Sequence, residues 1–152
     1  MTPSQLRAKV VSERIQWIRE MAERIRELPL EGYEEFNSDS RNIAAAESYL
    51  RRGLEALMDL GRHILAKGFG YAATEYKEIP KVLAQNGVLT NQEAHLMRKL
   101  AGYRNRMVHF YHEIPGQELY SMCSRQLEDI ENLTGAMARW IKENPDKIDQ
   151  TL

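Results

Sequence analysis

The stretch from Ser40 to Lys67 decides the fold, because it reads as one long helix: SRNIAAAESYLRRGLEALMDLGRHILAK. Apolar residues recur in it every three or four positions, a spacing that places them on one helical face. These residues are Ile43, Ala46, Leu50, Leu54, Leu57, Gly61 and Ile64. Ser38, Asp39 or Ser40 can cap the start, and Gly68 and Gly70 predict the end. The stretch therefore predicts a long amphipathic helix of a helical bundle.

The same periodicity continues on both sides of this stretch and predicts three further long helices and a short one. We expect them over about residues 2–28, 77–85, 90–114 and 117–143, with a loop over 31–37. Capping-box patterns open the first helix, at Thr2 and Gln5, and the helix after the short one, at Thr90 and Glu93. No segment alternates as a β-strand does. The sequence predicts an all-α, up-and-down bundle over residues 1–144, followed by a flexible tail over 145–152.

Composition excludes several classes of protein. No apolar run is long enough to cross a membrane, and the polar N-terminus does not resemble a signal peptide, so we expect no membrane contact. The single cysteine, Cys123, excludes an internal disulfide framework and favours the cytoplasm, where we expect it as a buried small hydrophobe. The net charge of −1 excludes a polycation, although basic clusters occur at Arg51–Arg52 and Arg98–Lys99.

Chemistry is concentrated between Arg104 and Tyr111, which read RNRMVHFY. An arginine binds phosphate oxygens through a fixed, permanently charged fork, and a histidine exchanges protons near neutral pH. Together they supply what RNA cleavage without a metal requires: proton transfer at the ribose 2′-hydroxyl and at the leaving oxygen, and a cation for the phosphorane charge. His109 and His112 lie beside Glu113, but no third well-spaced ligand follows, so we expect neither a metal nor a cofactor.

Helical geometry constrains this motif. Arg104 and His109 are five positions apart, which is about 140° around an ideal helix, so they do not converge on a straight one. Asn105 and His109 share a face. Either the helix ends or bends within the motif, or two copies of the chain complete one site across a two-fold dimer. The sequence leaves both possibilities open.

The segment from Arg104 to Tyr111 resembles the R-x4-H-x-Y motif of HepT-like toxins, a branch of the HEPN superfamily. The resemblance extends in order over about residues 5–142. It includes Arg41–Glu47, Glu55–Ile64, the short helix and turn at Lys81–Leu89, and Leu96–Asn105. At the position of Arg62 the family more often has a small polar residue, so the resemblance implies no role for that side chain.

The resemblance implies a fold of the HEPN type, a homodimer, and a metal-independent endoribonuclease toxin. Arg104 would stabilise the phosphate charge and His109 would act as general acid and base. Tyr111 would be the residue to which a partner, a minimal nucleotidyltransferase (MNT) antitoxin, adds AMP. Asn105 and Asp59 lie at positions where the family orients its site, and Arg106 would support RNA binding. A bulky anion in an electropositive cleft would exclude RNA sterically and electrostatically.

Two other functions fit the same residues. The chain could be a non-catalytic module that binds nucleotide or RNA for a nucleotidyltransferase, because a fold does not fix a function. It could also be a helical dimer with a structural role. The intact Arg104 and His109 pair favours the ribonuclease.

Overall fold

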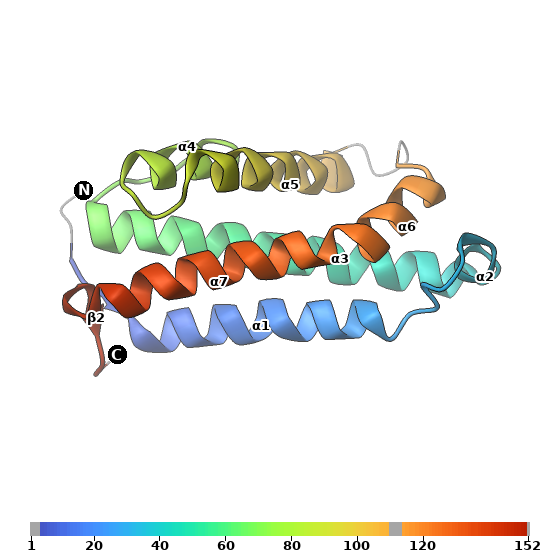
Figure 1. Cartoon of the computed structure of the whole chain (residues 1–152), viewed down its shortest axis with the longest axis horizontal. Helices are drawn as coiled ribbons and strands as arrows, with labels where there is room; N and C mark the ends of the chain where they lie inside the picture. The colour runs from blue at the N-terminus through green and yellow to red at the C-terminus, as the bar shows by residue number, and fades with distance from the viewer. Residues whose placement is uncertain (1–3, 110–113, 152) are drawn as a thin grey trace.

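A computed structural model of the chain describes residues 4–109 and 114–151, and most of these residues are helical (Figure 1). Four long helices lie along the long axis of the molecule: α1 (Ala8–Arg26), α3 (Ser40–His63), α5 (Asn91–His109) and α7 (Leu127–Glu143). The shorter helices are α2 (Tyr33–Asn37), α4 (Glu78–Gln85) and α6 (Gly116–Arg125). The prediction of an all-α bundle is confirmed.

Helix α3 occupies the centre of the bundle and packs against α1, α4, α5, α6 and α7. Its start is capped by Asp39, whose carboxylate accepts a hydrogen bond from the Arg41 N–H at 2.9 Å. The predicted apolar face is the buried one: Leu50, Leu54 and Leu57 are at most 2% exposed. The opposite face of α3 carries charged residues. The helix therefore contributes apolar side chains to the core on one face and charged side chains on the other.

The end of α3 is shaped by a close approach and by a change of helical pitch. A Cβ on Gly61 would lie 2.8 Å from Cγ2 of Ile79, so the glycine lets α4 pack directly on α3. Beyond His63 the chain continues as a π-helical turn, η1 (Ile64–Gly68). The helix ends with this turn, and the chain continues as a non-helical segment up to the start of α4.

The connection from α4 to α5 follows the sequence prediction. Gly87 adopts a φ of 76°, a left-handed conformation that favours glycine after a helix. The capping box at the start of α5 is formed: the Glu93 N–H donates to Thr90 Oγ1 at 3.1 Å, and the Thr90 N–H donates to Glu93 Oε1 at 2.9 Å. These contacts fix where α5 begins, and therefore which face its later residues present.

The beginning of the chain differs from the prediction. Helix α1 begins at Ala8, and Leu6–Arg7 form a short strand, β1, so Gln5 is not in the first turn of a helix; Thr2, the other residue of the predicted capping box, lies outside the described residues. The strand pairs in parallel with β2 (Ile148–Asp149), and Gln5 Nε2 donates to the Asp146 carbonyl at 3.1 Å. The expectation that no strand forms is corrected by this one pair, which is too short to show a sequence pattern.

The tail after residue 144 makes specific contacts through residue 151, and its predicted flexibility remains a prediction. It contains the 3-10 turn η3 (Pro145–Lys147) and β2, and the Lys147 ammonium donates to the Gly68 carbonyl at 3.2 Å. The last predicted helix is divided in two at Gln126, and the expected loop at 31–37 contains α2. Among the described residues no helix is long and apolar enough to span a membrane.

Candidate functional site

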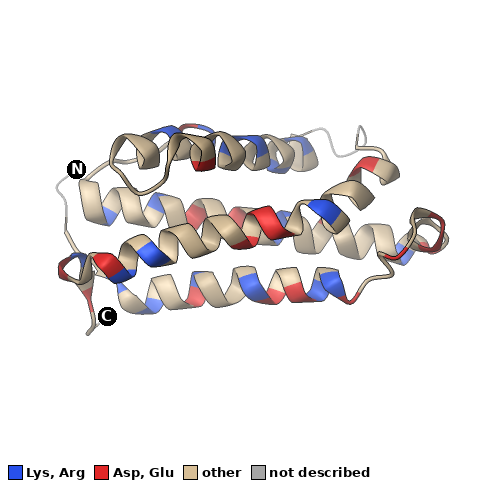
Figure 2. Cartoon of the chain, viewed as in Figure 1, with Lys and Arg blue, Asp and Glu red and all other residues tan. Residues whose placement is uncertain are grey.

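A polar pocket of about 490 Å³ lies where α3, the segment before α4 and the second half of α5 meet. Its lining residues are Arg62, Thr74, Glu75, Tyr76, Lys77, Arg104, Asn105 and His109. Three of these side chains carry a permanent positive charge and one carries a carboxylate. Basic residues recur along α5, as Figure 2 shows. The pocket therefore combines cations, an amide and a histidine, which is the chemistry predicted for the motif.

Arg104 is the most enclosed cation of this pocket, with its side chain 21% exposed. Its Nε lies 3.5 Å from Glu55 Oε1 on α3, and its Nη1 donates to Asn105 Oδ1 at 3.3 Å. Its guanidinium carbon lies 4.6 Å from the centroid of the Tyr76 ring. Helix α3 and the segment before α4 thus hold the guanidinium from two sides.

Asp59 is linked to the pocket through Tyr76. The Tyr76 hydroxyl donates to Asp59 Oδ1 at 3.1 Å, and Arg62 Nη1 lies 3.6 Å from the same oxygen. Burial raises the pKa of Tyr76, and the neighbouring Asp59 carboxylate adds to this shift. The hydroxyl therefore stays protonated and remains a donor to Asp59.

His109 and Arg104 line the same pocket although they point to different sides of α5. His109 is exposed and is the last described residue of α5, one turn beyond Asn105 on the same face. The long Arg104 side chain reaches the pocket from the neighbouring face by lying over Tyr76. Of the two resolutions predicted for the motif, an end or bend of the helix within it remains a prediction, because α5 is described only to His109 and residues 110–113 lie outside the described residues. The possibility of a dimer remains a prediction.

Arg106 lies outside the pocket, and Tyr111 falls outside the described residues. Arg106 does not line the pocket: its guanidinium makes two contacts with the Glu118 carboxylate of α6, at 2.5 and 3.1 Å. Its support of RNA binding remains a prediction. Tyr111 lies outside the described residues, and so do Phe110, His112 and Glu113.

Sequence reasoning missed part of the pocket. Glu55 and Arg62 were missed, although they lie four and three positions from the predicted Asp59 on α3, so their common face was a readable signal. Tyr76 and Lys77 gave no such signal, because they precede α4 and reach the pocket only through the packing of that helix on Gly61. His63, near Arg62, takes no part in the pocket: its Nε2 accepts the Arg7 N–H at 3.0 Å.

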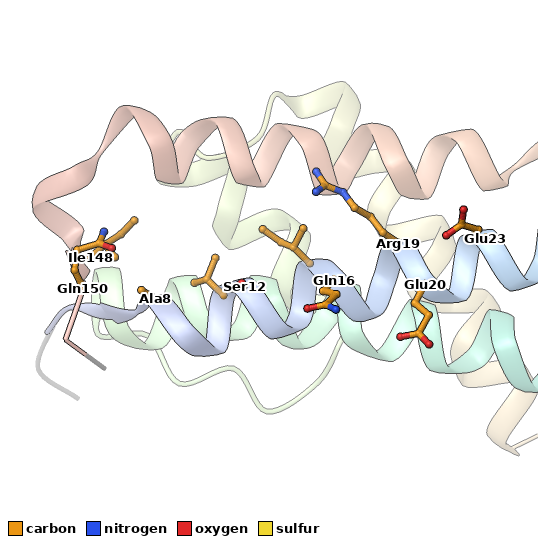
Figure 3. Close-up of a pocket in the computed structure, with 10 residues that line it drawn as sticks. Ala8, Ser12, Gln16, Arg19, Glu20, Glu23, Ile148 and Gln150 are labelled. Carbon is orange, nitrogen blue, oxygen red and sulfur yellow. The ribbon is translucent and has the colours of Figure 1, made fainter.

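A larger pocket, of about 760 Å³, runs along α1 beside the tail (Figure 3). Its charged residues do not converge: Arg19 and Glu23 extend to one side of the helix and Glu20 to the other (Figure 3). It contains no histidine or cysteine. We therefore place the candidate site at the smaller pocket, where the reactive side chains gather. In neither pocket do the described residues group three metal-ligating side chains.

The fold and the pocket define the class of the protein, an all-α bundle with an arginine and histidine site on the second half of α5. The family model described as "Ribonuclease HepT-like" matches residues 18–137, well over half of the chain and inclusive of the whole motif. The chain belongs to the HepT-like ribonuclease family. No curated protein sequence matches it significantly.

Solved structures with the same fold include proteins of toxin–antitoxin complexes. A tri-AMPylated HEPN toxin of Shewanella oneidensis, in complex with an MNT antitoxin, is 24% identical. The match covers 86% of this chain and 97% of that one, with a TM-score of 0.77. A toxin–antitoxin structure with AMP-PNP is 23% identical over 84% and 97% of the two chains, with a TM-score of 0.75.

A third structure, YutE from Bacillus subtilis, is described as a cytosolic protein of unknown function. It is 16% identical over 88% of this chain and 90% of that one, with a TM-score of 0.74. At these identities the likeness shows a shared fold, and the HEPN-type bundle predicted from the sequence is confirmed.

Proposed function

We propose that this chain is a metal-independent endoribonuclease, the toxin of a HEPN/MNT toxin–antitoxin pair. The observation that carries the proposal is that Arg104, Asn105 and His109 line one pocket. Membership of the HepT-like ribonuclease family gives the reaction class, and two similar structures are toxin–antitoxin complexes.

The reaction assigned to this pocket needs only side chains. A base removes the proton of the ribose 2′-hydroxyl, its oxygen bonds to phosphorus, and the bond to the 5′-oxygen breaks as that oxygen is protonated. His109 is the proton-transfer group, since a histidine can give or take a proton at neutral pH. Arg104 stabilises the charge on the phosphoryl oxygens. Asn105 and Asp59 orient the site, Asn105 by its contact with Arg104 and Asp59 through Tyr76.

Control of this activity is assigned to Tyr111. AMP added there by a minimal nucleotidyltransferase would place a bulky anion two residues from His109 and exclude RNA. A similar structure is described as a tri-AMPylated toxin in complex with an MNT antitoxin, which supports this assignment.

The proposal includes a cytoplasmic homodimer. A two-fold dimer would bring a second copy of the motif to the cleft, so that one His109 could act as base and the other as acid. The description of YutE as cytosolic supports the compartment.

RNA cleavage in the presence of EDTA tests the ribonuclease. Wild type should cut an RNA oligonucleotide and leave it intact when every ribose is 2′-deoxy, since the nucleophile is then missing. The His109→Ala and Arg104→Gln variants should be inactive. Cleavage that persists in His109→Ala, or depends on an added metal, would reject the proposal. RNA binding without cleavage by wild type would favour the non-catalytic module.

Mass spectrometry tests the modification. The toxin is incubated with ATP, magnesium and its neighbouring nucleotidyltransferase, and Tyr111→Phe is compared with Tyr71→Phe, since Tyr71 is an exposed tyrosine outside the pocket. We expect an AMP adduct on wild type and Tyr71→Phe and none on Tyr111→Phe. An adduct mapped only to other residues would refute the assignment.

A further inference from the structure

The pocket holds a second arginine that the proposed reaction does not use. Arg62 lines it together with Arg104, and its guanidinium carbon lies 4.9 Å from the centroid of the Tyr76 ring that also carries Arg104. Both charges are therefore within about 5 Å of one ring centre. Two guanidinium groups on one ring concentrate positive charge at this pocket, and concentrated positive charge favours an anion beside it.

Neither arginine forms a short hydrogen bond with its neighbouring carboxylate. Arg62 Nη1 is 3.6 Å from Asp59, and Arg104 Nε is 3.5 Å from Glu55. A charge-assisted hydrogen bond is typically 2.7–2.9 Å long. The Nε atoms of both arginines are buried and make no hydrogen bond with any described residue. The carboxylates thus lie close enough to orient the two guanidinium groups but not to saturate them.

A purely structural role explains the geometry less well. The Arg62–Asp59 pair is partly exposed, with side chains 40% and 34% accessible, and exposed pairs of this kind stabilise a fold only weakly. A stabilising pair also has no need of a second guanidinium on the same ring. The cations Arg62, Arg104 and Lys77 outnumber the single carboxylate, Glu75, that lines the pocket, while Asp59 and Glu55 contact the arginines from α3.

We propose that Arg62 binds the RNA phosphate next to the scissile one, and that Tyr76 is the positioning residue that holds Arg62 and Arg104 against one ring at the pocket. This inference rests on the proposed function, in which Arg104 binds the scissile phosphate. Single-stranded RNA carries one negative charge for each nucleotide, so a strand threaded through the pocket presents a second phosphate to a second cation. The site would therefore bind two adjacent phosphates of the RNA backbone rather than one.

The test measures binding rather than cleavage. The probe is a fluorescein-labelled RNA octanucleotide with 2′-O-methyl riboses, which lacks the nucleophile and stays intact. Fluorescence anisotropy gives Kd at several salt concentrations. For Arg62→Gln we expect weaker binding and a salt slope that falls by about 0.7, the value for one lost phosphate contact on a single strand. Arg62→Lys should keep the slope.

A matched control is Arg139→Gln, which removes an exposed arginine of α7 that lies outside the pocket. Its Kd and slope should equal those of wild type. If Arg62→Gln keeps the wild-type slope, or Arg139→Gln loses as much, Arg62 binds no phosphate of its own. Wild type that binds this probe but does not cleave the same sequence with free 2′-hydroxyl groups would refute the ribonuclease alone. Wild type that fails to bind the probe refutes both.

Two substitutions separate the ring of Tyr76 from its hydroxyl. Tyr76→Phe keeps the ring and should bind RNA with nearly the wild-type Kd and slope. Tyr76→Leu removes the ring and should lower both the affinity and the slope, because neither arginine is then held in place. Equal losses in the two variants would contradict the positioning role of the ring and assign the effect to the hydroxyl contact with Asp59.

Discussion

At the scale of single residues, His63 gives the clearest pH dependence. It is half-buried, and burial together with Lys67, Arg7 and Arg14 lowers its pKa from 6.5 to about 4. In the folded chain it is neutral and accepts the Arg7 N–H. Between pH 6.5 and 4 the unfolded chain therefore binds a proton that the folded chain does not, and stability falls as the pH is lowered through this window.

The expected loss is on the order of 1–2 kcal/mol, after allowance for the solvent screening of a half-exposed group. Urea unfolding of wild type and His63→Gln at pH 7 and pH 4.5 measures it. The acid-dependent loss should shrink in His63→Gln and persist in His95→Gln, which changes an exposed histidine of α5. An unchanged loss in His63→Gln would show that other groups carry the pH dependence.

Cys123 illustrates a residue whose chemistry is suppressed by its position. It is 1% exposed, and burial raises the pKa of its thiol to about 12. Native protein should react with a thiol reagent such as DTNB far more slowly than unfolded protein at pH 8. Rapid labelling of the folded chain would contradict its burial. Here the sequence prediction of a buried small hydrophobe is confirmed.

Also at the scale of residues, some members of the candidate site could be predicted from the sequence and others could not. The Arg104 and His109 spacing was readable because both lie in one short motif. Tyr76 was not, because its contact with Arg104 depends on how α4 packs against α3. Helical geometry correctly separated Arg104 from His109 around the helix, but it ignored the length of the arginine side chain, which reaches the same pocket.

At the scale of elements, the packing of α4 on α3 depends on Gly61. An added Cβ would meet Ile79, Leu83 and Met97 within 3.3 Å, so buried side chains of two helices would have to move. Overpacking costs about 1–3 kcal/mol, whereas alanine gains about 1 kcal/mol over glycine in a helix. We expect Gly61→Ala to lower the free energy of unfolding by about 1 kcal/mol.

Gly135→Ala is the matched control, because a Cβ there meets nothing within 4 Å. It should raise the free energy of unfolding by up to about 1 kcal/mol. Urea unfolding measures both variants. Stabilisation by Gly61→Ala as large as that by Gly135→Ala would contradict the close approach of α4.

Elements with local signals were predicted well and the others were not. The capping residues Asp39 and Thr90 lie beside the helices they start, so the sequence shows them directly. The start of α1 was wrong because Leu6 is fully buried in strand β1, whose partner is more than 140 residues away in the sequence. Such long-range pairing has no local signature.

At the scale of the whole molecule, the two ends of the chain hold each other. Strand β2 pairs with β1, and the tail is also fixed by the Gln5 and Lys147 hydrogen bonds. Removal of residues 145–152 should lower Tm, because backbone groups of β1 lose their partners. Replacement of Lys147 by Gln should have a smaller effect in the same direction. An unchanged Tm of the shortened chain would contradict docking of the tail.

In the proposed function, His109 carries out catalysis within this pocket. The most direct measurement of this role compares His109 with His95, a second histidine of the same helix. Both are exposed residues of α5, but only His109 lies in the pocket. Single-turnover RNA cleavage in EDTA should be about 10²–10⁴-fold slower for His109→Ala than for wild type. His95→Ala should cleave at the wild-type rate. Equal rates for His109→Ala and wild type would contradict the claim.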